Sequence, residues 1–150
     1  MKLNEIKNLT EAAEKNLFGF KINGTEITKD TPNEVWIGDF NCWSNGLKSL
    51  EYCPKIVNGN FNCSDNKLKS LKGIHKQLHQ INGTFFARGN PIVSNVIGIL
   101  LVKGCKKIHI NNEEVEAILN KYLPNTSGML SVLECQSELI EAGYEDYAEL

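Results

Sequence analysis

Three segments of the chain share one pattern of alternating apolar and polar residues. The first runs from Trp36 to Leu50, the second from Val57 to Leu71, and a partial third from Ile81 to Ile92. One phenylalanine marks the same step in each copy, and these residues are Phe40, Phe61 and Phe85. A motif that returns after 21 and then 24 residues predicts a solenoid, in which each strand-plus-return unit buries its apolar side only against its neighbours.

Within each copy the apolar residues fall at every second position, which is the period of a strand with one buried side. Copies laid side by side predict short parallel strands, with the three phenylalanines stacked as one interior column. An asparagine follows each strand at a fixed step, at Asn45, Asn66 and Asn90. We expect these amides to bond the backbone of adjacent copies, because a short strand leaves such groups open.

The segment before the repeats predicts a cap. Apolar residues recur at helical spacing over residues 2–16, which predicts a short helix. Alternating apolar residues then flank Asn23-Gly24 and predict a hairpin, because both turn residues must tolerate a positive φ.

The last third of the chain predicts a mostly helical cap. The apolar run from Val96 to Val102 fits either a helix or a buried strand, and residues 106–110 are compatible with a last strand. Asn112 is expected to cap one helix, and Ser131-x-x-Glu134 is expected to open another as a capping box. The predicted buried side of that second helix consists of Val132, Leu133, Gln136, Leu139 and Ile140.

These elements predict one compact α+β unit with parallel strands. Its parts are an N-terminal helix and hairpin cap over residues 1–35, the repeats over 36–93, and a mostly helical cap over 94–150.

The pattern Ile37-x-x-Phe40-x-Cys42-x-x-Asn45-x-Leu47 resembles the leucine-rich repeat, with phenylalanine and cysteine in place of leucine. The later copies depart from the motif at its first position, where Asn58 and Asn82 stand. The resemblance covers residues 36–92 and implies a short leucine-rich-repeat-like solenoid whose strands line a concave face. It names no partner.

A second resemblance concerns origin. Two parts of the sequence resemble small uncharacterised proteins of tailed bacteriophages. They are the motif Gly-x-Phe-x-Cys-x-x-Asn-x-Leu-x-Ser-Leu and the segment from Leu133 to Gly143. No assigned activity comes with this resemblance. It implies a viral protein in the cytoplasm of a bacterial host, and for such a product we expect binding that inhibits or redirects a host or defence protein.

Composition is that of a soluble domain. The 150 residues are 41% hydrophobic and 23% charged, and no apolar run reaches membrane-spanning length, so no membrane partner is expected. The amino terminus lacks the apolar core of a secretory signal. The odd number of five cysteines is therefore interpreted as reduced thiols in a cytosol. Cys42 and Cys63 are expected to be apolar fillers with inert thiols of unperturbed pKa.

The side chains at alternate strand positions that face outward form the candidate protein-binding surface. The repeat register predicts three rows, which are Asp39, Asn60 and Thr84; Asn41, Asn62 and Phe86; and Trp43, Ser64 and Arg88. Tryptophan and arginine are among the side chains that dominate protein hot spots. The alternative for Trp43 and Phe86 is burial beneath the caps.

A second candidate surface is basic. It comprises Lys48, Lys55, Lys67, Lys69, Lys72, Lys76, His75 and His79, which fall on the return path between copies. Spaced phosphate contacts would need such a row, but a pI near 5.9 argues against a nucleic-acid partner and favours a solvated face. Acidic residues gather elsewhere, with nine of them and a single lysine in residues 113–150.

The sequence lacks the recognisable motifs of catalysis. It has no glycine-rich phosphate loop, no Gly-x-Ser-x-Gly elbow and no Cys-x-x-Cys pair. His75 and His79 are four residues apart without the glutamate of a helical zinc protease. We expect a chain that is not an enzyme and needs no metal or cofactor. A structural, self-assembling protein with an imperfectly capped edge remains the other alternative.

Overall fold

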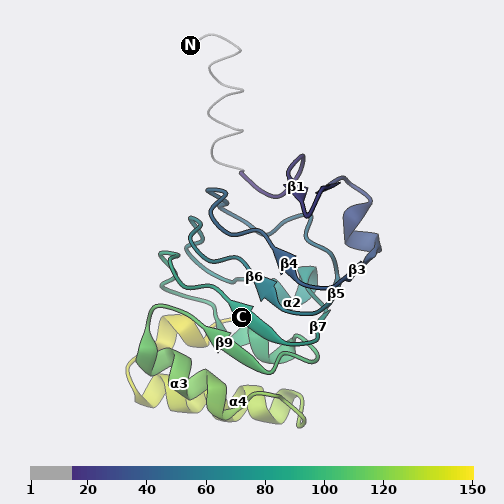
Figure 1. Ribbon diagram of the computed structural model, residues 1–150. Coiled ribbons are helices and arrows are strands. Elements are labelled where there is room, and N and C mark those ends of the chain that lie inside the picture. The colour runs from purple at the N-terminus through teal and green to yellow at the C-terminus, as the bar shows by residue number, and fades with distance from the viewer. Residues whose placement is uncertain (1–14) are drawn as a thin grey trace, which may run out of the picture.

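The computed structural model describes residues 15–150, and its main feature is a set of parallel strands stacked in the order of the repeats (Figure 1). A four-stranded sheet contains, in this order, β4 (Phe40–Asn41), β6 (Phe61–Asn62), β8 (Thr84–Phe86) and β9 (Lys107–His109). Every pairing within it is parallel. The prediction of short parallel strands is therefore confirmed.

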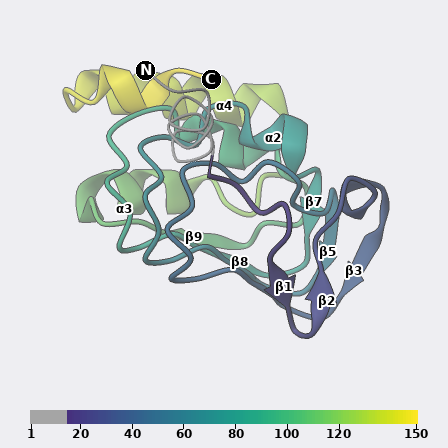
Figure 2. The same cartoon turned by 90° about the horizontal axis from the view of Figure 1, so that it is seen from above.

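Each copy contributes a strand to a second sheet as well. This sheet contains β3 (Val35–Ile37), β5 (Ile56–Asn58) and β7 (Gln80–Ile81), again all parallel. The single strand expected in each copy is thus divided in two. In the first copy the division falls at Gly38, whose φ of +88° no extended strand adopts. Figure 2 looks along the stack and shows the two sheets on adjoining sides of the fold.

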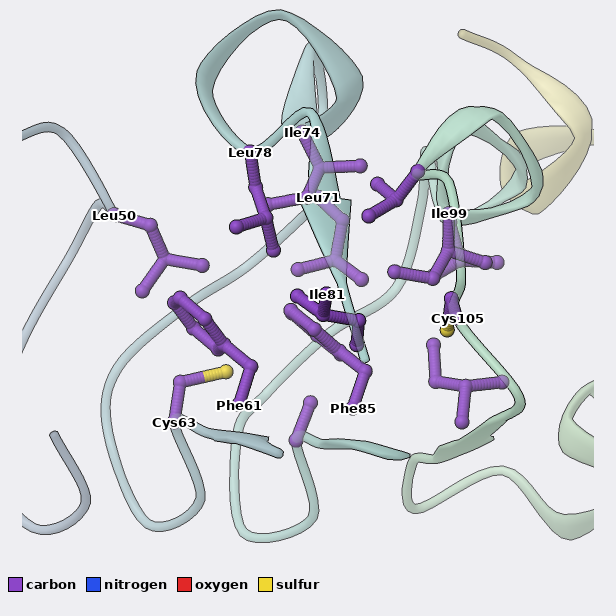
Figure 3. Close-up of a cluster of buried hydrophobic side chains, with 14 of the residues drawn as sticks. Leu50, Phe61, Cys63, Leu71, Ile74, Leu78, Ile81, Phe85, Ile99 and Cys105 are labelled. Carbon is purple, nitrogen blue, oxygen red and sulfur yellow. The ribbon is translucent and has the colours of Figure 1, made fainter. Parts of the chain in front are cut away.

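The phenylalanine column forms as predicted. Phe40 pairs with Phe61, and Phe61 pairs with Phe85. Neighbouring ring centroids lie 5.1 and 5.2 Å apart, and all three rings are fully buried. Figure 3 shows the rings of Phe61 and Phe85 side by side, facing Ile74 and Leu78 from the opposite side of the core. At about 25 cal/mol for each Å² of apolar surface removed from water, this column is a main source of stability.

The four-stranded sheet extends one strand beyond the three recognised copies. β9 lies in the range predicted to be a cap, and its Ile108 pairs with Phe85, so it continues the interior column. The apolar run whose structure the sequence left open is a 3-10 helix, η2 (Ile97–Leu101).

Buried asparagines join the copies behind the strands. Asn66 Oδ1 accepts the backbone N–H groups of Asn45 and Leu47, at 2.9 and 3.0 Å. Asn90 does the same for Leu68, at 3.1 Å, one copy further along. The predicted bonds to adjacent backbone are therefore confirmed for these two residues. The side chain of Asn45 instead donates to the carbonyl of Cys42 within its own copy.

The predicted hairpin covers the first end of the stack. β1 (Lys21–Ile22) and β2 (Thr25–Glu26) pair in antiparallel fashion around Asn23-Gly24, and a short helix, η1 (Thr31–Asn33), leads on to β3. The helix predicted over residues 2–16 lies almost wholly outside the described residues.

Two helices and a short third segment cover the other end (Figure 1). α3 (Glu113–Lys121) packs on β9 and on α4 (Met129–Glu141), and η3 (Glu145–Ala148) packs on α4. The side chain of Asn112 accepts the N–H of Val115 at 3.0 Å, so this cap is confirmed.

The predicted start and buried side of α4 are both wrong in part. The helix begins at Met129 after Gly128, and Ser131 lies inside its first turn without a capping bond. The start is fixed instead by Asn125, whose amide donates to the carbonyls of Leu100 and Gly128. The buried stripe is Val132, Cys135 and Leu139, whereas Leu133 and Ile140, of the predicted set, are exposed.

The remaining helix, α2 (Ile74–Gln77), lies in the return path before β7. Within the described part of the chain, none of the helices has the length and apolar character that a membrane crossing needs.

Candidate functional site

The nine predicted residues follow the register of the four-stranded sheet, and we call them together the strand face. Asn41 lies opposite Asn62, and Asn62 lies opposite Phe86. The same register continues past the strand ends, where Ser44 donates its N–H to the carbonyl of Ser64 and Asp65 donates to Arg88. The three rows are thus kept in step by backbone bonds.

The first row is partly engaged within the fold. Asp39 Oδ1 accepts the N–H of Asn60 at 2.8 Å, and Asn60 Oδ1 accepts the N–H of Thr84 at 2.8 Å. Each side chain therefore satisfies the backbone of the next copy. One carboxylate or amide oxygen in each residue is committed to this bond, which leaves less of the row available to a partner than the sequence suggested.

The second row combines turn-forming amides with a stacked ring. Asn41 and Asn62 each accept the N–H two residues further on, from Trp43 and Ser64, at 3.3 and 3.0 Å. Bonds of this kind fix the direction in which the chain leaves a strand. Phe86 is half-buried and stacks on a ring one strand away, at 5.4 Å between centroids.

The third row is the most exposed part of the strand face. The indole of Trp43 is 54% exposed, so the alternative that it packs beneath a cap is excluded. The side chain of Arg88 is 56% exposed, although its Nη2 pairs with Glu116 at 2.9 Å. A large, half-exposed aromatic ring and a half-exposed guanidinium in one row are the features expected of a protein-binding surface.

The strand expected within residues 106–110 forms as β9, but sequence reasoning did not place it beside the third copy as a fourth strand of this surface. Thr84 lies opposite Lys107 and Phe86 lies opposite His109, whose ring is the one stacked on Phe86. One signal was present, because Ile108 and Ile110 alternate with polar residues as in the earlier copies. Residues 106–110 lack the Gly-x-Phe motif by which those copies were recognised.

Glu116 of α3 joins the end of the strand face to the cap. Its carboxylate accepts bonds from Arg88 Nη2, from the N–H of Ile110 at 2.9 Å, and contacts His109 Nδ1 at 3.1 Å. Burial by itself would raise the pKa of Glu116, but the bonds from Ile110, Arg88 and His109 outweigh burial and lower the pKa. The group is therefore a carboxylate at neutral pH and holds Arg88 and His109 in place.

A second exposed apolar surface lies on α4. Four large side chains on this helix are each at least half exposed, and they are Met129, Leu130, Leu133 and Ile140. Their spacing brings them to one side of the helix, away from the stripe that packs on the core. The sequence reasoning missed this surface because it assigned Leu133 and Ile140 to the buried side.

The predicted basic residues lie between the strands of successive copies. Lys48, Lys67 and Lys69 are exposed and line one surface hollow, and Lys72 and Lys76 line another. His75 is half-buried, and burial together with the charges of Lys76 and His79 lowers its pKa.

The five cysteines are free and buried. Burial raises the pKa of Cys53, Cys105 and Cys135 to about 12, and it raises the pKa of Cys42 and Cys63 as well. The expectation of an unperturbed pKa for Cys42 and Cys63 is therefore wrong, because both thiols lie in the core. In residues 15–150, no three His, Cys, Asp or Glu side chains are grouped so that they could hold a metal ion.

Comparisons with other proteins give no guide to function. A scan against family models, a search of curated proteins and a search of solved structures each found no match. The function is therefore inferred from the residues and their geometry.

Proposed function

We propose that this chain is a non-enzymatic protein-binding module, built as a short leucine-rich-repeat-like solenoid. The strand face is the binding surface. The observation that carries this proposal is the third row, where Trp43 and Arg88 are both more than half exposed at one step of the repeat. Residues of these two types are enriched among hot spots because they combine large contact area with hydrogen bonding.

The surface is well suited to binding because it is rigid. Backbone bonds between copies and the Asp39 and Asn60 bonds hold the strands in register. Asn41 and Asn62 fix the chain just before Trp43 and Ser64. A surface that is already ordered loses less conformational entropy on association, so more of the contact energy appears as affinity.

The partner class follows from the resemblance to phage proteins. A phage product in the cytoplasm of a bacterial host, with no recognisable catalytic motif, acts by occupying a host or defence protein and inhibiting or redirecting it. On this proposal Trp43 fills an apolar depression of the partner, and Arg88 faces an acidic or carbonyl group beside it.

The test is quantitative affinity capture from bacterial lysate, read by mass spectrometry. The native chain is compared with a triple variant, Trp43→Ala with Phe86→Ala and Arg88→Ala. Hot-spot residues contribute about 2 kcal/mol or more each, so capture of a true partner should fall more than about tenfold. Circular dichroism and thermal unfolding must show that the triple variant keeps its fold.

A matched control removes three exposed apolar side chains from α4, as Leu130→Ala with Leu133→Ala and Ile140→Ala. The proposal expects this control to capture the partner as the native chain does. Capture that survives the strand-face variant and disappears with the α4 variant would assign binding to α4. Capture unaffected by both variants would reject both surfaces.

Self-assembly is a second candidate, favoured by one observation. β3 lies at the edge of its sheet, and Val35 and Ile37 on it are 55% and 77% exposed. Exposed apolar edge strands tend to pair with other chains. Light scattering over a range of concentrations tests this, since Ile37→Lys should abolish an oligomer that uses β3. A native monomer at every concentration would reject this candidate.

A further inference from the structure

A surface hollow between the return paths collects positive charge. Lys48, Lys67 and Lys69 line it together with Ser70 and Pro91, and we call these five residues the lysine hollow. Lys48 and Lys69 occupy the same step of successive copies. Lys67 is held beside the first copy by its N–H, which donates to the carbonyl of Leu47 at 2.8 Å. The stacking of the copies therefore brings the three lysines to the lining of one hollow.

A lysine from the preceding segment lies beside the first copy, with its Nζ 5.8 Å from the centroid of the Phe20 ring. Gly46 occupies the step in the first copy that Lys67 occupies in the second. Lys15 Nζ lies 3.2 Å from the point where a Cβ of Gly46 would stand. Lys15 is fixed there by its carbonyl, which accepts the N–H of Lys48 at 2.8 Å. The missing side chain at Gly46 is thus replaced by a lysine from the preceding segment.

Folding does not neutralise this charge within the described residues. The ion pairs of residues 15–150 involve Arg88, His109 and Lys121 as their basic members. Among these described pairs, none involves Lys48, Lys67 or Lys69. Like charges on adjacent copies repel one another, and exposed ammonium groups add nothing to the core. An anion between them would remove the repulsion.

The cluster is short along the stack. In the third copy, the steps of Lys67 and Lys69 are taken by Pro91 and Val93. The backbone of two acidic residues follows close by, since the main-chain carbonyls of Asp146 and Glu149 accept bonds from Asn95. A long polyanion laid across the copies would meet this apolar and acidic end. A compact anion meets only the lysines.

Ser70 supplies a neutral donor at the same place. Its Oγ accepts the N–H of Lys72 at 3.4 Å, which leaves the hydroxyl hydrogen free to donate. Ammonium groups and a hydroxyl around one hollow are the donors that recognise phosphate oxygens. We propose that the lysine hollow binds a compact phosphate group, as a phosphomonoester or a diphosphate. The site is separate from the strand face.

Titration calorimetry with inorganic pyrophosphate at low ionic strength tests this proposal. The native chain is compared with a triple variant, Lys48→Gln with Lys67→Gln and Lys69→Gln. A control variant, Lys55→Gln with Lys103→Gln and Lys106→Gln, removes the same charge from exposed lysines elsewhere. We expect saturable binding to the native chain, a loss of about tenfold or more in the hollow variant, and a change within about twofold in the control.

A parallel titration with a single-stranded oligonucleotide separates the sources of phosphate. Pyrophosphate bound in the hollow with no tighter binding of the oligonucleotide supports a small phosphate ligand. Three results overturn the proposal. They are the absence of saturable pyrophosphate binding, an equal loss in both variants, and oligonucleotide binding with a steep salt dependence while pyrophosphate does not bind. All three leave the strand-face proposal unaffected, because neither variant alters Trp43, Phe86 or Arg88.

Discussion

The carboxylate of Asp39 accepts a hydrogen bond from the backbone N–H of Asn60, 2.8 Å away and one copy further along the stack. The bond repeats between Asn60 and Thr84. The residue directly before each donor is a glycine, namely Gly59 before Asn60 and Gly83 before Thr84. A Cβ at Gly59 would lie only 2.6 Å from Asp39 Oδ1. The repeat motif therefore includes a steric constraint: the side-chain oxygen that accepts this bond on one copy requires a glycine at the facing position of the next copy.

Replacing Gly83 by alanine should violate this steric constraint and destabilise the fold. The new Cβ would overlap Asn60 Oδ1, so we expect the free energy of unfolding to fall by about 1–3 kcal/mol. Urea unfolding measures the change. In an Asn60→Ala background the overlapping oxygen is gone, and the cost of Gly83→Ala should be clearly smaller. Strictly additive costs in the double variant would contradict the steric explanation.

Replacing Asn66 by alanine should cost more than replacing Asn45. The Asn66 side chain bonds the N–H groups of Asn45 and Leu47 and the carbonyls of Cys42 and Cys63, all in a buried place. Buried groups left unsatisfied cost about 1–3 kcal/mol each before relaxation, so we expect a loss of about 3 kcal/mol. Asn45→Ala removes one bond, and about 1 kcal/mol is expected. Equal losses in chemical denaturation would argue against the asymmetry.

Stability should depend on pH through Glu116. Its folded pKa lies below the usual value, so its stabilisation is complete above the pKa of an unfolded glutamate, near about 4.3. It is lost as the pH falls through the lower folded value. Glu116→Gln should therefore destabilise the protein by about 1–2 kcal/mol at neutral pH, and by progressively less below pH about 4. Unfolding curves at several pH values measure this, and a pH-independent difference would rule it out.

The thiols should be unreactive until the chain unfolds. Burial raises the pKa of Cys53, Cys105 and Cys135 to about 12, and the thiolate is the form that reacts. A colorimetric thiol reagent at pH 8 should titrate all five cysteines in denaturant. In native conditions it should react only as fast as the protein opens. Rapid reaction of any one thiol without denaturant would show that it is accessible.

The two tryptophans should respond differently to an aqueous quencher. Trp43 is 54% exposed, whereas Trp36 is 8% exposed and donates its Nε1–H to the carbonyl of Asp39. Acrylamide should quench mainly the Trp43 emission. The Trp43→Phe variant should therefore keep a blue-shifted spectrum with weak quenching. Strong quenching that persists in this variant would place Trp36 in water and contradict the register of the first copy.

The register of the copies was predictable from sequence because it depends on spacing alone. Phe40, Phe61 and Phe85 repeat at steps that only stacked parallel strands satisfy together, and Asn66 and Asn90 repeat with them. The fourth strand was not recognised as a copy, because the segment around Ile108 keeps the alternation of apolar and polar residues but lacks the rest of the repeat motif.

Features that depend on bonds between distant residues could not be predicted. The start of α4 depends on Asn125 reaching the carbonyl of Leu100, and a shift in that start changes which side chains face solvent. The pairing of Arg88 and His109 with Glu116 joins a strand face to a helix that follows it. No local pattern in the sequence marks either contact. The three predicted rows were therefore placed correctly in register, while their engagement by neighbouring groups was not foreseen.

The helix α2 lies in the longer of the two intervals between copies, while β6 and β8 remain paired residue for residue across it. Additional length has thus been accommodated without shifting the sheet. A peptide tag, a fluorophore attachment site or a whole extra segment inserted near Gln77 should therefore leave the strand register intact. This interval is where such a scaffold can acquire new sequence, in evolution or in the laboratory, provided that Ile74 and Leu78 keep their buried positions.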